Sequence, residues 1–503
     1  MKYSKLLILL LIFSPGAFAQ KDNKIIIGTV DSVYSSVLKE QRKVWVYVPN
    51  MKSGIQGAGN RYPVVYLLDG DGHFESVVGM IQQLSQVNGN TIVPEMIVVG
   101  IPNTDRTRDL TPTHIADDPP MMDSGFSKST GGGENFSAFL EKELMPHIDS
   151  TYPTQPYKML IGHSFGGLAV MHILTNHTKL FNAYIAIDPS MWYDKEKFLK
   201  ATEKKLSTQK YDGTSLYVGI ANTLPEAMTV EQMKKDTTAD TRHIRSIFAM
   251  DKFIKTNTKN GLKYASKYYA NDDHSSVPLT SEYDGLRFIF NWYRFKFIRA
   301  DFADPGTGIA QRLRQHYETA SKQFGFKLAP PEMMVNGLGY NALSQQQYAK
   351  AAALFKMNIE NYPASANVYD SYADLLVLQK DTATAITHYQ KALVMGESAE
   401  TRRKLNELEG KQTFTLPAAE LAKYAAVFEF EGMALTATFF VKDNALWATV
   451  PGQDDSELVP MSPAEFGVKG KKGYNVRFEM DGNKPLGFTA TQPDGTYKAH
   501  VKK

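Results

Sequence analysis

The sequence predicts an α/β fold with a mainly parallel sheet, followed by a small helical repeat segment and a small antiparallel β domain. Short β-branched and aromatic runs alternate with helical stretches from Ile25 to about Ile298, as in a parallel sheet covered by helices. Two apolar segments then recur at the period of a helical repeat, and the end of the chain alternates apolar and polar residues between turns. The length of 503 residues also exceeds what one hydrophobic core normally holds, which favours several domains.

Residues 1–19 are predicted to be a secretory signal peptide. Lys2 and Lys5 precede the apolar run Leu6 to Phe13, and Ala17-Phe18-Ala19 offers the small residues of a cleavage site. A membrane anchor is the alternative, but this run is too short to cross about 30 Å of hydrocarbon. We therefore expect cleavage after Ala19, no stable membrane insertion, and a mature protein that is periplasmic or secreted. Because the sequence contains no cysteine, we expect neither disulfides nor a cysteine-linked lipid anchor.

Residues 20–300 are predicted to form the α/β domain. Several of its apolar runs contain almost no polar residue, as strands that are buried on both faces must. The candidate strands are Val44–Val48, Val64–Leu68, Met96–Val99, Lys158–Ile161, Tyr184–Ile187, Leu216–Ile220 and Lys267–Ala270. Between Asp105 and Glu134 the chain is rich in Pro, Asp, Ser and Gly and follows neither period. We predict a long mobile loop there, lying over the site and selecting the substrate.

Residues 301–335 are predicted to be a helical connector that ends at Pro330-Pro331, and residues 336–411 a tetratricopeptide-like helical segment. Its signature is two segments that superpose at a spacing of 34 residues, the period of that repeat, namely Ala351-Ala352-Ala353-Leu354-Phe355 and Ala385-Ile386-Thr387-His388-Tyr389. Fewer than three repeats are too few for a free-standing solenoid, so we expect the segment to pack on its neighbours. A protein partner is expected to bind through it.

Residues 412–503 are predicted to be a small β-rich domain. Leu435 to Val441 and Leu446 to Val450 alternate on either side of Asp443-Asn444, which predicts a β-hairpin. Asp481-Gly482 and Asp494-Gly495 predict two further hairpin turns.

The charge balance excludes some classes of partner. The net charge is +3, and basic and acidic residues are interleaved along the chain. No long-range field therefore favours nucleic acid or an anionic membrane surface. A small or neutral substrate is the better expectation.

The strongest local motif is Gly162-His163-Ser164-Phe165-Gly166, which follows an apolar strand and opens a helical stretch. This is G-x-S-x-G in the strand-turn-helix context in which it places a nucleophilic serine on a strained turn. Gly162 and Gly166 are required because side chains two residues before and after the serine would collide. The backbone N–H of Phe165 then lies at a helix N-terminus, where it can stabilise an oxyanion. The alternative is a chance match in a glycine-rich turn.

A second oxyanion donor is expected from the loop after an earlier strand. Val64 to Leu68 leads directly into Asp69-Gly70-Asp71, and the backbone N–H of Asp71 is the candidate donor. The alternative is a plain tight turn, because Asp-Gly pairs mark turns of many kinds.

A serine nucleophile needs a base, which arrives last in chain order in this kind of fold. His274 lies after the last apolar strand and before a helix, and is therefore the predicted general base. Other histidines compete poorly, since His163 and His172 flank the nucleophile and His388 lies outside the domain.

The acid that would orient His274 is the least defined member of the site. The strand Leu216 to Ile220 leads to Ala221-Asn222, so an amide stands where a carboxylate is often expected. Glu226 is the nearest carboxylate downstream and is the predicted acid. Four other carboxylates and a Ser-His dyad oriented by Asn222 stay open as alternatives, the carboxylates being Asp236, Asp240, Asp272 and Asp273.

These residues together resemble the esterase family of α/β-hydrolases, which includes siderophore, feruloyl and acetyl-xylan esterases and relatives of S-formylglutathione hydrolase. The resemblance covers roughly residues 25–298. Besides the two catalytic motifs it rests on three segments, Tyr66-Leu67-Leu68-Asp69-Gly70, Asn103 with Arg106, Arg108, Asp109, Leu110, Thr111 and Pro112, and Asp188-Pro189-Ser190-Met191-Trp192-Tyr193. It implies an α/β-hydrolase domain and a serine carboxylic-ester hydrolase that works through an acyl-enzyme, with no metal or organic cofactor.

The resemblance also implies substrate-binding residues. The loop that contains Trp192 should border the pocket and offer an aromatic face to an aryl or sugar group. Arg106 or Arg108 would meet an acidic or catecholate substrate. The alternative is structural, with Arg108 and Asp109 holding the loop and Trp192 in the core. The expected substrate is a small, siderophore-linked or glycan-linked ester. The rival functions are an inactive hydrolase-fold scaffold that binds a partner through its C-terminal segments, and an acyltransferase.

Overall fold

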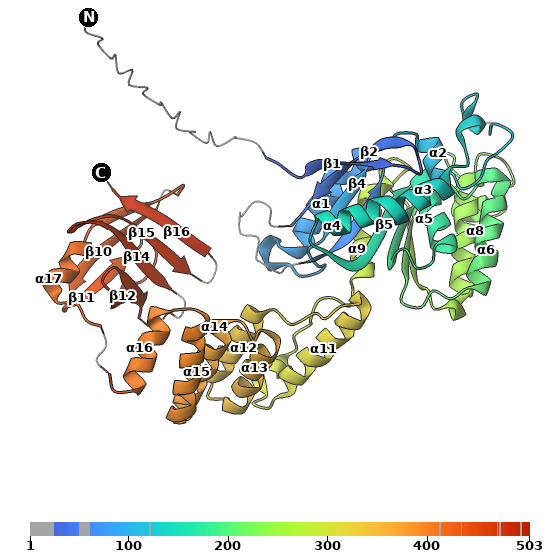
Figure 1. Ribbon diagram of the computed structural model, residues 1–503. Helices are drawn as coiled ribbons and strands as arrows, with labels where there is room; N and C mark the ends of the chain where they lie inside the picture. Colours follow the sequence, from blue (N-terminus) through green and yellow to red (C-terminus); the bar gives the residue numbers. More distant parts are fainter. Residues whose placement is uncertain are drawn as a thin grey trace, which may run out of the picture. The chain divides into compact units, whose positions relative to one another are not determined.

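The computed structural model describes residues 25–49, 61–119, 122–411, 414–433, 435–469, 471, 474–492 and 495–502. The predicted signal peptide therefore lies outside the described residues. The chain divides into two compact units (Figure 1). Unit 1 is Met1–Phe295 together with Lys322–Phe326, and unit 2 is Lys296–Ser321 together with Lys327–Lys503. In the described part of the chain, no helix is both long and apolar enough to span a membrane.

Unit 1 is built on an eight-stranded sheet with the strand order β1-β2-β4-β3-β5-β6-β7-β8. The strands are β1 (Thr29–Ser35), β2 (Glu40–Tyr47), β3 (Tyr62–Leu68), β4 (Ile97–Ile101), β5 (Thr154–His163), β6 (Ala183–Ile187), β7 (Ser215–Ala221) and β8 (Lys263–Tyr269). Neighbouring strands from β4 through β8 pair in parallel, whereas β1 and β2 pair antiparallel at one edge. The predicted α/β class with a mainly parallel sheet is confirmed.

Two groups of helices cover this sheet (Figure 1). Helix α1 (Gly70–Ser85) packs beside α9 (Val277–Ile289), and α5 (Phe165–Asn176) packs beside α3 (Gly133–Phe139) and α6 (Lys197–Thr208). Every residue of β3, β4, β6 and β7 is buried, because helices exclude water from both faces of these strands. Because β5, β6, β7 and β8 pair in parallel, their carboxyl ends meet at one edge of the sheet, where loop residues can converge.

The segment that we predicted to be one irregular loop, between Asp105 and Glu134, contains regular structure. Asp105 caps helix α2 (Arg106–Leu110) by accepting a hydrogen bond from the backbone N–H of Arg108. A short 3₁₀ turn spans Phe126–Ser129, and α3 begins at Gly133. Helix α2 is too short to show an amphipathic period in the sequence, which explains why the pattern missed it.

Unit 2 begins with helices, and those between residues 332 and 408 pack against one another in consecutive order. The helices are α10 (Arg299–Ala303), α11 (Gly308–Phe324, whose last turn belongs to unit 1), α12 (Glu332–Ser344), α13 (Tyr348–Asn361), α14 (Ala366–Leu378), α15 (Thr382–Met395) and α16 (Ala399–Leu408). The two alanines at the 34-residue spacing, Ala351 and Ala385, lie at equivalent places on α13 and α15 and are fully buried. Each of these helices packs against the helix before it, α12 or α14. The tetratricopeptide character of this segment stays a prediction.

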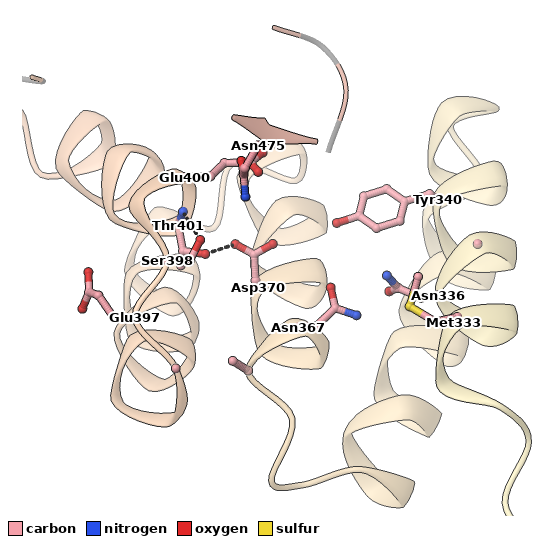
Figure 2. A pocket seen from close by; sticks show the side chains of 13 residues that line it. Met333, Asn336, Tyr340, Asn367, Asp370, Glu397, Ser398, Glu400, Thr401 and Asn475 are labelled. Atoms are coloured by element: carbon pink, nitrogen blue, oxygen red, sulfur yellow. Dashed lines mark hydrogen bonds between the residues drawn. The ribbon is translucent and has the colours of Figure 1, made fainter. Parts of the chain in front are cut away.

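Helices α12, α14 and α16 surround a cavity of about 510 Å³, which Asn475 borders at the start of strand β14 (Figure 2). The hydroxyl of Thr401 donates a hydrogen bond of 2.9 Å to the carboxylate of Asp370 in its wall. Helix α16 also packs on strand β12, so these helices and the C-terminal strands share contacts within unit 2.

The C-terminal strands form a closed antiparallel barrel in the order β10-β11-β12-β13-β14-β15-β16-β9. The strands are β9 (Val427–Phe430), β10 (Thr436–Lys442), β11 (Ala445–Thr449), β12 (Ser456–Ser462), β13 (Glu465–Val468), β14 (Asn475–Asp481), β15 (Lys484–Gln492) and β16 (Gly495–Val501). The predicted antiparallel β domain is confirmed. Asp443 and Asn444 both have positive φ, 54° and 59°, as the tight turn between β10 and β11 requires. Phenylalanine rings fill the interior, among them Phe428, Phe439, Phe478 and Phe488.

Candidate active site

Ser164 lies on a strained turn between β5 and α5. Its φ of 59° and ψ of −114° fall in a region that non-glycine residues rarely adopt. A Cβ on Gly162 would lie 2.4 Å from the carbonyl oxygen of Gly166, and a Cβ on Gly166 would lie 3.0 Å from Oδ2 of Asp69. The two glycines therefore permit the turn, as the motif predicts.

Backbone hydrogen bonds fix this turn from both sides. The N–H of Ser164 donates to the carbonyl of Ile187, and the N–H of Ser190 donates to the carbonyl of Ser164, over 2.9 and 3.1 Å. The Ser164 hydroxyl is partly exposed and lies 3.5 Å from the Ser190 hydroxyl. The loop after β6 is thereby held against the nucleophile.

His274 lies at the same edge of the sheet, in the loop between β8 and α9. Its imidazole Nδ1 is 2.6 Å from Oδ2 of Asp188, and its side chain is 40% exposed. The ring centroid lies 4.5 Å from that of His163, the residue before the nucleophile. Because Nδ1 faces the carboxylate, Nε2 is the nitrogen left to exchange a proton with a substrate or with Ser164.

Asp188, and not Glu226, is the carboxylate that orients His274. Glu226 is exposed in the loop after β7, whereas Asp188 is fully buried at the end of β6. The prediction of Glu226 as the acid is wrong. It rested on an acid after β7, but the amide of Asn222 lies there and donates to the carbonyl of Ala270. The four other carboxylates that we weighed are likewise not the partner of His274.

A second imidazole shares the same carboxylate oxygen. Nε2 of His243, on α8 (Arg242–Thr256), lies 2.7 Å from Oδ2 of Asp188, and Oδ1 accepts a hydrogen bond of 3.0 Å from the backbone N–H of Ala221. Burial raises the pKa of Asp188, but the hydrogen bonds from His243 and His274 outweigh it and hold the pKa well below its ordinary value. Asp188 is therefore a carboxylate at neutral pH.

His163 and His73 lie close to the catalytic histidine. Burial, together with the neighbouring imidazoles of His274 and His73, lowers the pKa of His163 to about 4. His163 is thus neutral at neutral pH. The hydrogen bond from His73 to the buried carboxylate of Glu282, over 3.0 Å, raises the pKa of His73 above its ordinary value. No described contact gives either residue a role in proton transfer.

The predicted second oxyanion donor, the N–H of Asp71, lies in the first turn of α1 and not in a plain turn. Asp69 caps this helix with a left-handed φ of 53°, and its carboxylate approaches Gly166 of the nucleophile turn. The N-termini of α1 and α5 therefore lie side by side. Both present unpaired backbone N–H groups of the kind that stabilise negative charge.

Arg106 holds these two helix termini together. Its guanidinium makes a bidentate ion pair with Asp69 at 2.6 and 2.9 Å, contacts the carbonyl of His163, and lies 5.6 Å from the centroid of Phe165. Burial raises the pKa of Asp69, but the ion pair with Arg106 outweighs it and lowers the pKa below its ordinary value. The side chain of Arg106 is 34% exposed, so it still borders the site.

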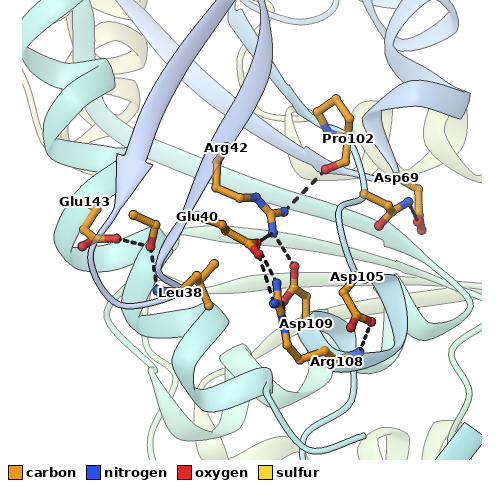
Figure 3. A network of polar contacts seen from close by, with 11 residues as sticks. Leu38, Glu40, Arg42, Asp69, Pro102, Asp105, Arg108, Asp109 and Glu143 are labelled. Carbon is orange, nitrogen blue, oxygen red and sulfur yellow. Dashed lines mark hydrogen bonds and ion pairs between the residues drawn. The ribbon is translucent and has the colours of Figure 1, made fainter. Parts of the chain in front are cut away.

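Arg108 is part of a buried ionic network beside the site (Figure 3). Its guanidinium pairs with Glu40 and Asp109, and the buried Arg42 pairs with the same two carboxylates. Arg108 thus ties α2 to β2, and the structural alternative fits it better than substrate binding does.

Trp192 is also structural. Its side chain is only 6% exposed and packs against Phe165 and Tyr193, with centroids 5.9 and 6.4 Å apart. The expectation that Trp192 offers an open aromatic face to the substrate is therefore wrong, and the alternative that it belongs to the core fits the structure. Phe126, from the segment between α2 and α3, stacks on Phe165 at 5.6 Å and so covers the residue next to the nucleophile.

Two groups of side chains in the described residues have donor sets suited to a metal ion. One is Asp188 with His243 and His274, which the arrangement above already uses for proton transfer. The other, Glu134 with His172 and His177, lies on α3 and at the end of α5. Sequence reasoning considered His172 only as a rival base and did not connect it with Glu134.

Comparison with known proteins agrees with this geometry. A family model described as "Putative esterase" matches residues 35–274. The chain is 30% identical to ferri-bacillibactin esterase BesA of Bacillus subtilis over 36% of this chain and 65% of that protein. It is 24% identical to siderophore enterobactin esterase of Emericella nidulans over 46% of this chain and 84% of that protein. The match thus spans just under two thirds of the Bacillus protein.

A solved structure extends the likeness to a whole relative. The IroE-like serine hydrolase from Shewanella oneidensis is 30% identical, with a TM-score of 0.55, and the match covers 66% of this chain and 99% of that one. That protein is named as a serine hydrolase, in accord with the partly exposed Ser164 and the His274–Asp188 pair described above. The chain therefore belongs to this esterase family of the α/β-hydrolases.

Proposed function

We propose that this protein is an exported serine esterase that cleaves a small, siderophore-linked carboxylic ester through an acyl-enzyme. The observation that carries the proposal is the 2.6 Å contact between His274 and the buried Asp188, beside a serine on a strained turn. A nucleophile, a base and a group that orients the base are the three parts that acyl transfer requires.

In the proposed reaction, Nε2 of His274 removes the proton of Ser164 as Oγ attacks the ester carbonyl. The N–H of Phe165, and that of Asp71 as the proposed second donor, stabilise the oxyanion of the tetrahedral intermediate. His274 then gives its proton to the departing alcohol, which leaves an acyl-Ser164. A water molecule, deprotonated by His274, attacks this ester and releases the acid and the free serine. Asp188 keeps Nδ1 of His274 protonated and stabilises the imidazolium.

The substrate class rests on the named relatives. The proteins from Bacillus and Emericella are named as esterases of siderophores. A glycan-linked ester is the second candidate on the basis of the sequence alone. Binding of a protein partner through residues 336–411 is likewise a prediction from the sequence.

Hydrolysis of short-chain p-nitrophenyl esters and of a cyclic catecholate siderophore ester tests the activity. We expect turnover of both by the wild-type protein, and a fall in kcat of about 10⁴-fold or more in Ser164→Ala and in His274→Ala. Equal inactivity of wild type and Ser164→Ala on these esters, and on acetyl-sugar esters, would favour the scaffold function. A product that forms only with an added alcohol or sugar acceptor would favour acyl transfer.

Export is tested separately from activity. We expect expression of the full sequence in a Gram-negative host to give a protein in the periplasm or the medium whose first residue is Gln20. A chain that keeps Met1 and stays in the cytoplasm would contradict export without bearing on the esterase proposal.

A further inference from the structure

We infer that Glu134, His172 and His177 form a binding site for a divalent transition-metal ion, with zinc the best match, outside the esterase site. One donor atom from each residue lies within 4.8 Å of the other two. Two histidines and one glutamate are a ligand set that zinc uses in proteins, with a water molecule in the fourth position. All three residues belong to unit 1.

Two of the three distances between donor atoms match the edges of a coordination tetrahedron. Nε2 of His172 lies 3.2 Å from one oxygen of Glu134, and Nε2 of His177 lies 3.1 Å from the other. Zinc–ligand bonds of 2.0–2.1 Å in a tetrahedron place neighbouring donor atoms about 3.3 Å apart. These two contacts go to different oxygens of Glu134, and the two Nε2 atoms lie within 4.8 Å of each other, so the three side chains would draw together to share one ion.

In the described structure, the Nε2 atoms of both histidines face the carboxylate of Glu134. Both Nε2 atoms are buried, and neither makes a hydrogen bond, although each lies near the carboxylate. Buried polar atoms without a hydrogen bond are uncommon and usually have a partner that the protein alone does not supply. The His172 residue is 7% exposed, so its ring is held inside the fold and aimed at Glu134.

Surrounding contacts hold the two histidines in place. Nδ1 of His172 lies 3.1 Å from the side-chain amide of Asn176, and the backbone N–H of His177 donates to the carbonyl of Ile173. The carboxylate of Glu134 is 66% exposed and closes the site on the solvent side, which leaves an entry path for an ion.

The location separates this site from catalysis. His172 lies eight positions after Ser164 on α5, which corresponds to about 12 Å along a helix that rises 1.5 Å per residue. The ion would therefore not touch the ester. It would tie α3 to the C-terminal end of the helix that carries the nucleophile, and so stabilise unit 1 against unfolding.

Calorimetric titration of the metal-free full-length protein with Zn²⁺ or Co²⁺, together with thermal unfolding, tests the site. We expect one ion per chain and a rise in the unfolding temperature. Glu134→Gln should weaken binding about tenfold or more and His177→Gln about a hundredfold, with loss of the rise in unfolding temperature. Glu134→Gln changes one exposed side chain, so it should fold normally even if a histidine variant does not.

Two matched variants serve as controls. His147→Gln removes a histidine that also lies beside a carboxylate, at 2.8 Å from Asp31, but has no third ligand. His243→Gln disrupts the other candidate donor set, at Asp188. Both should bind zinc as the wild type does. The inference is overturned if the wild type binds no zinc, if Glu134→Gln and His177→Gln bind like the wild type, or if only His243→Gln abolishes binding.

Discussion

At the scale of single residues, Asp188 has the largest influence on the site, because it accepts hydrogen bonds from His274, His243 and the backbone of Ala221. We predict that Asp188→Asn lowers kcat for a p-nitrophenyl ester by about 10⁴-fold, because the imidazole loses the anion that fixes its tautomer. Glu226→Gln is the matched control and should leave kcat unchanged, since Glu226 is exposed on a loop. Steady-state kinetics of the two variants at pH 7 compares the assignments directly. The opposite order of effects would restore Glu226 as the acid.

The sequence contained a signal for Asp188 that the expectation of an acid after the strand Leu216 to Ile220 obscured. Asp188 directly follows the apolar strand that comes after the nucleophile, and its positive φ of 42° turns the chain back toward the serine. Because that expectation places the acid one strand after the strand that precedes Asp188, the sequence analysis assigns the Asp188 segment only to the border of the pocket. His243 had no local signal at all, since it lies on an ordinary amphipathic helix and meets Asp188 only through the packing of α8.

The shared carboxylate also predicts a pH-dependent effect of His243. Asp188 has a depressed pKa in the folded state, so its stabilising contribution is present above the ordinary value of 3.8 and is lost as the pH falls through the depressed value. His243→Leu removes one hydrogen-bond donor and moves the folded-state pKa back toward 3.8. We expect a loss of about 1.5–3 kcal/mol in the free energy of unfolding at pH 6 that shrinks below pH 3.

Urea unfolding at pH 6 and pH 2 measures how the loss in the free energy of unfolding changes with pH. His147→Leu, which breaks a partly exposed ion pair with Asp31, is the control and should cost less than about 1 kcal/mol at pH 6. An equal loss at pH 6 and pH 2 in His243→Leu would mean that His243 contributes packing alone.

At the scale of elements, the turn from β5 into α5 combines strain with close packing. We predict that Gly162→Ala lowers the free energy of unfolding by about 1–3 kcal/mol and reduces kcat, because its Cβ would overlap the carbonyl of Gly166. Gly79→Ala, in the middle of α1 with no atom within 4 Å of the new Cβ, should be neutral or stabilising by about 0.5–1 kcal/mol. Chemical unfolding of both variants provides the comparison, and similar stabilities would remove the steric explanation of the motif.

The elements that the sequence predicted well are the ones that water cannot reach. The runs that became β3, β4, β6 and β7 are apolar throughout because both faces are covered, so composition alone identified them. Strand β1 was missed because it lies at the edge of the sheet with most of its residues at least partly exposed. Its pairing with β2 depends on how the residues of the two strands align, which the sequence of either strand alone does not reveal.

At the scale of the whole molecule, the order of the parts followed from changes in periodicity, but the closure of the barrel did not. Each hairpin is encoded locally by its turn, as at Asp443 and Asn444. Closure requires β9 to pair with both β10 and β16, which lie far apart in the sequence. The phenylalanines that fill the interior become neighbours only through that closure. Local patterns therefore predicted strands and turns, whereas the enclosed core forms only when all the strands of the barrel have paired.

The limit of unit 1 leads to a prediction for the whole chain, because Phe324 lies beyond the end that we predicted for the α/β domain, residue 300. Phe324 is 1% exposed and its ring lies 5.2 Å from Tyr157 and 5.0 Å from Trp292. We expect Phe324→Ala to lower the free energy of unfolding by about 3–5 kcal/mol and to lower the temperature at which esterase activity is lost. Phe302→Ala, which truncates a phenylalanine that is 43% exposed in unit 2, is the control and should change that temperature little. Equal shifts in the two variants would show that the α/β domain ends near residue 300, whereas a shift confined to Phe324→Ala means that the last turn of α11 completes its core.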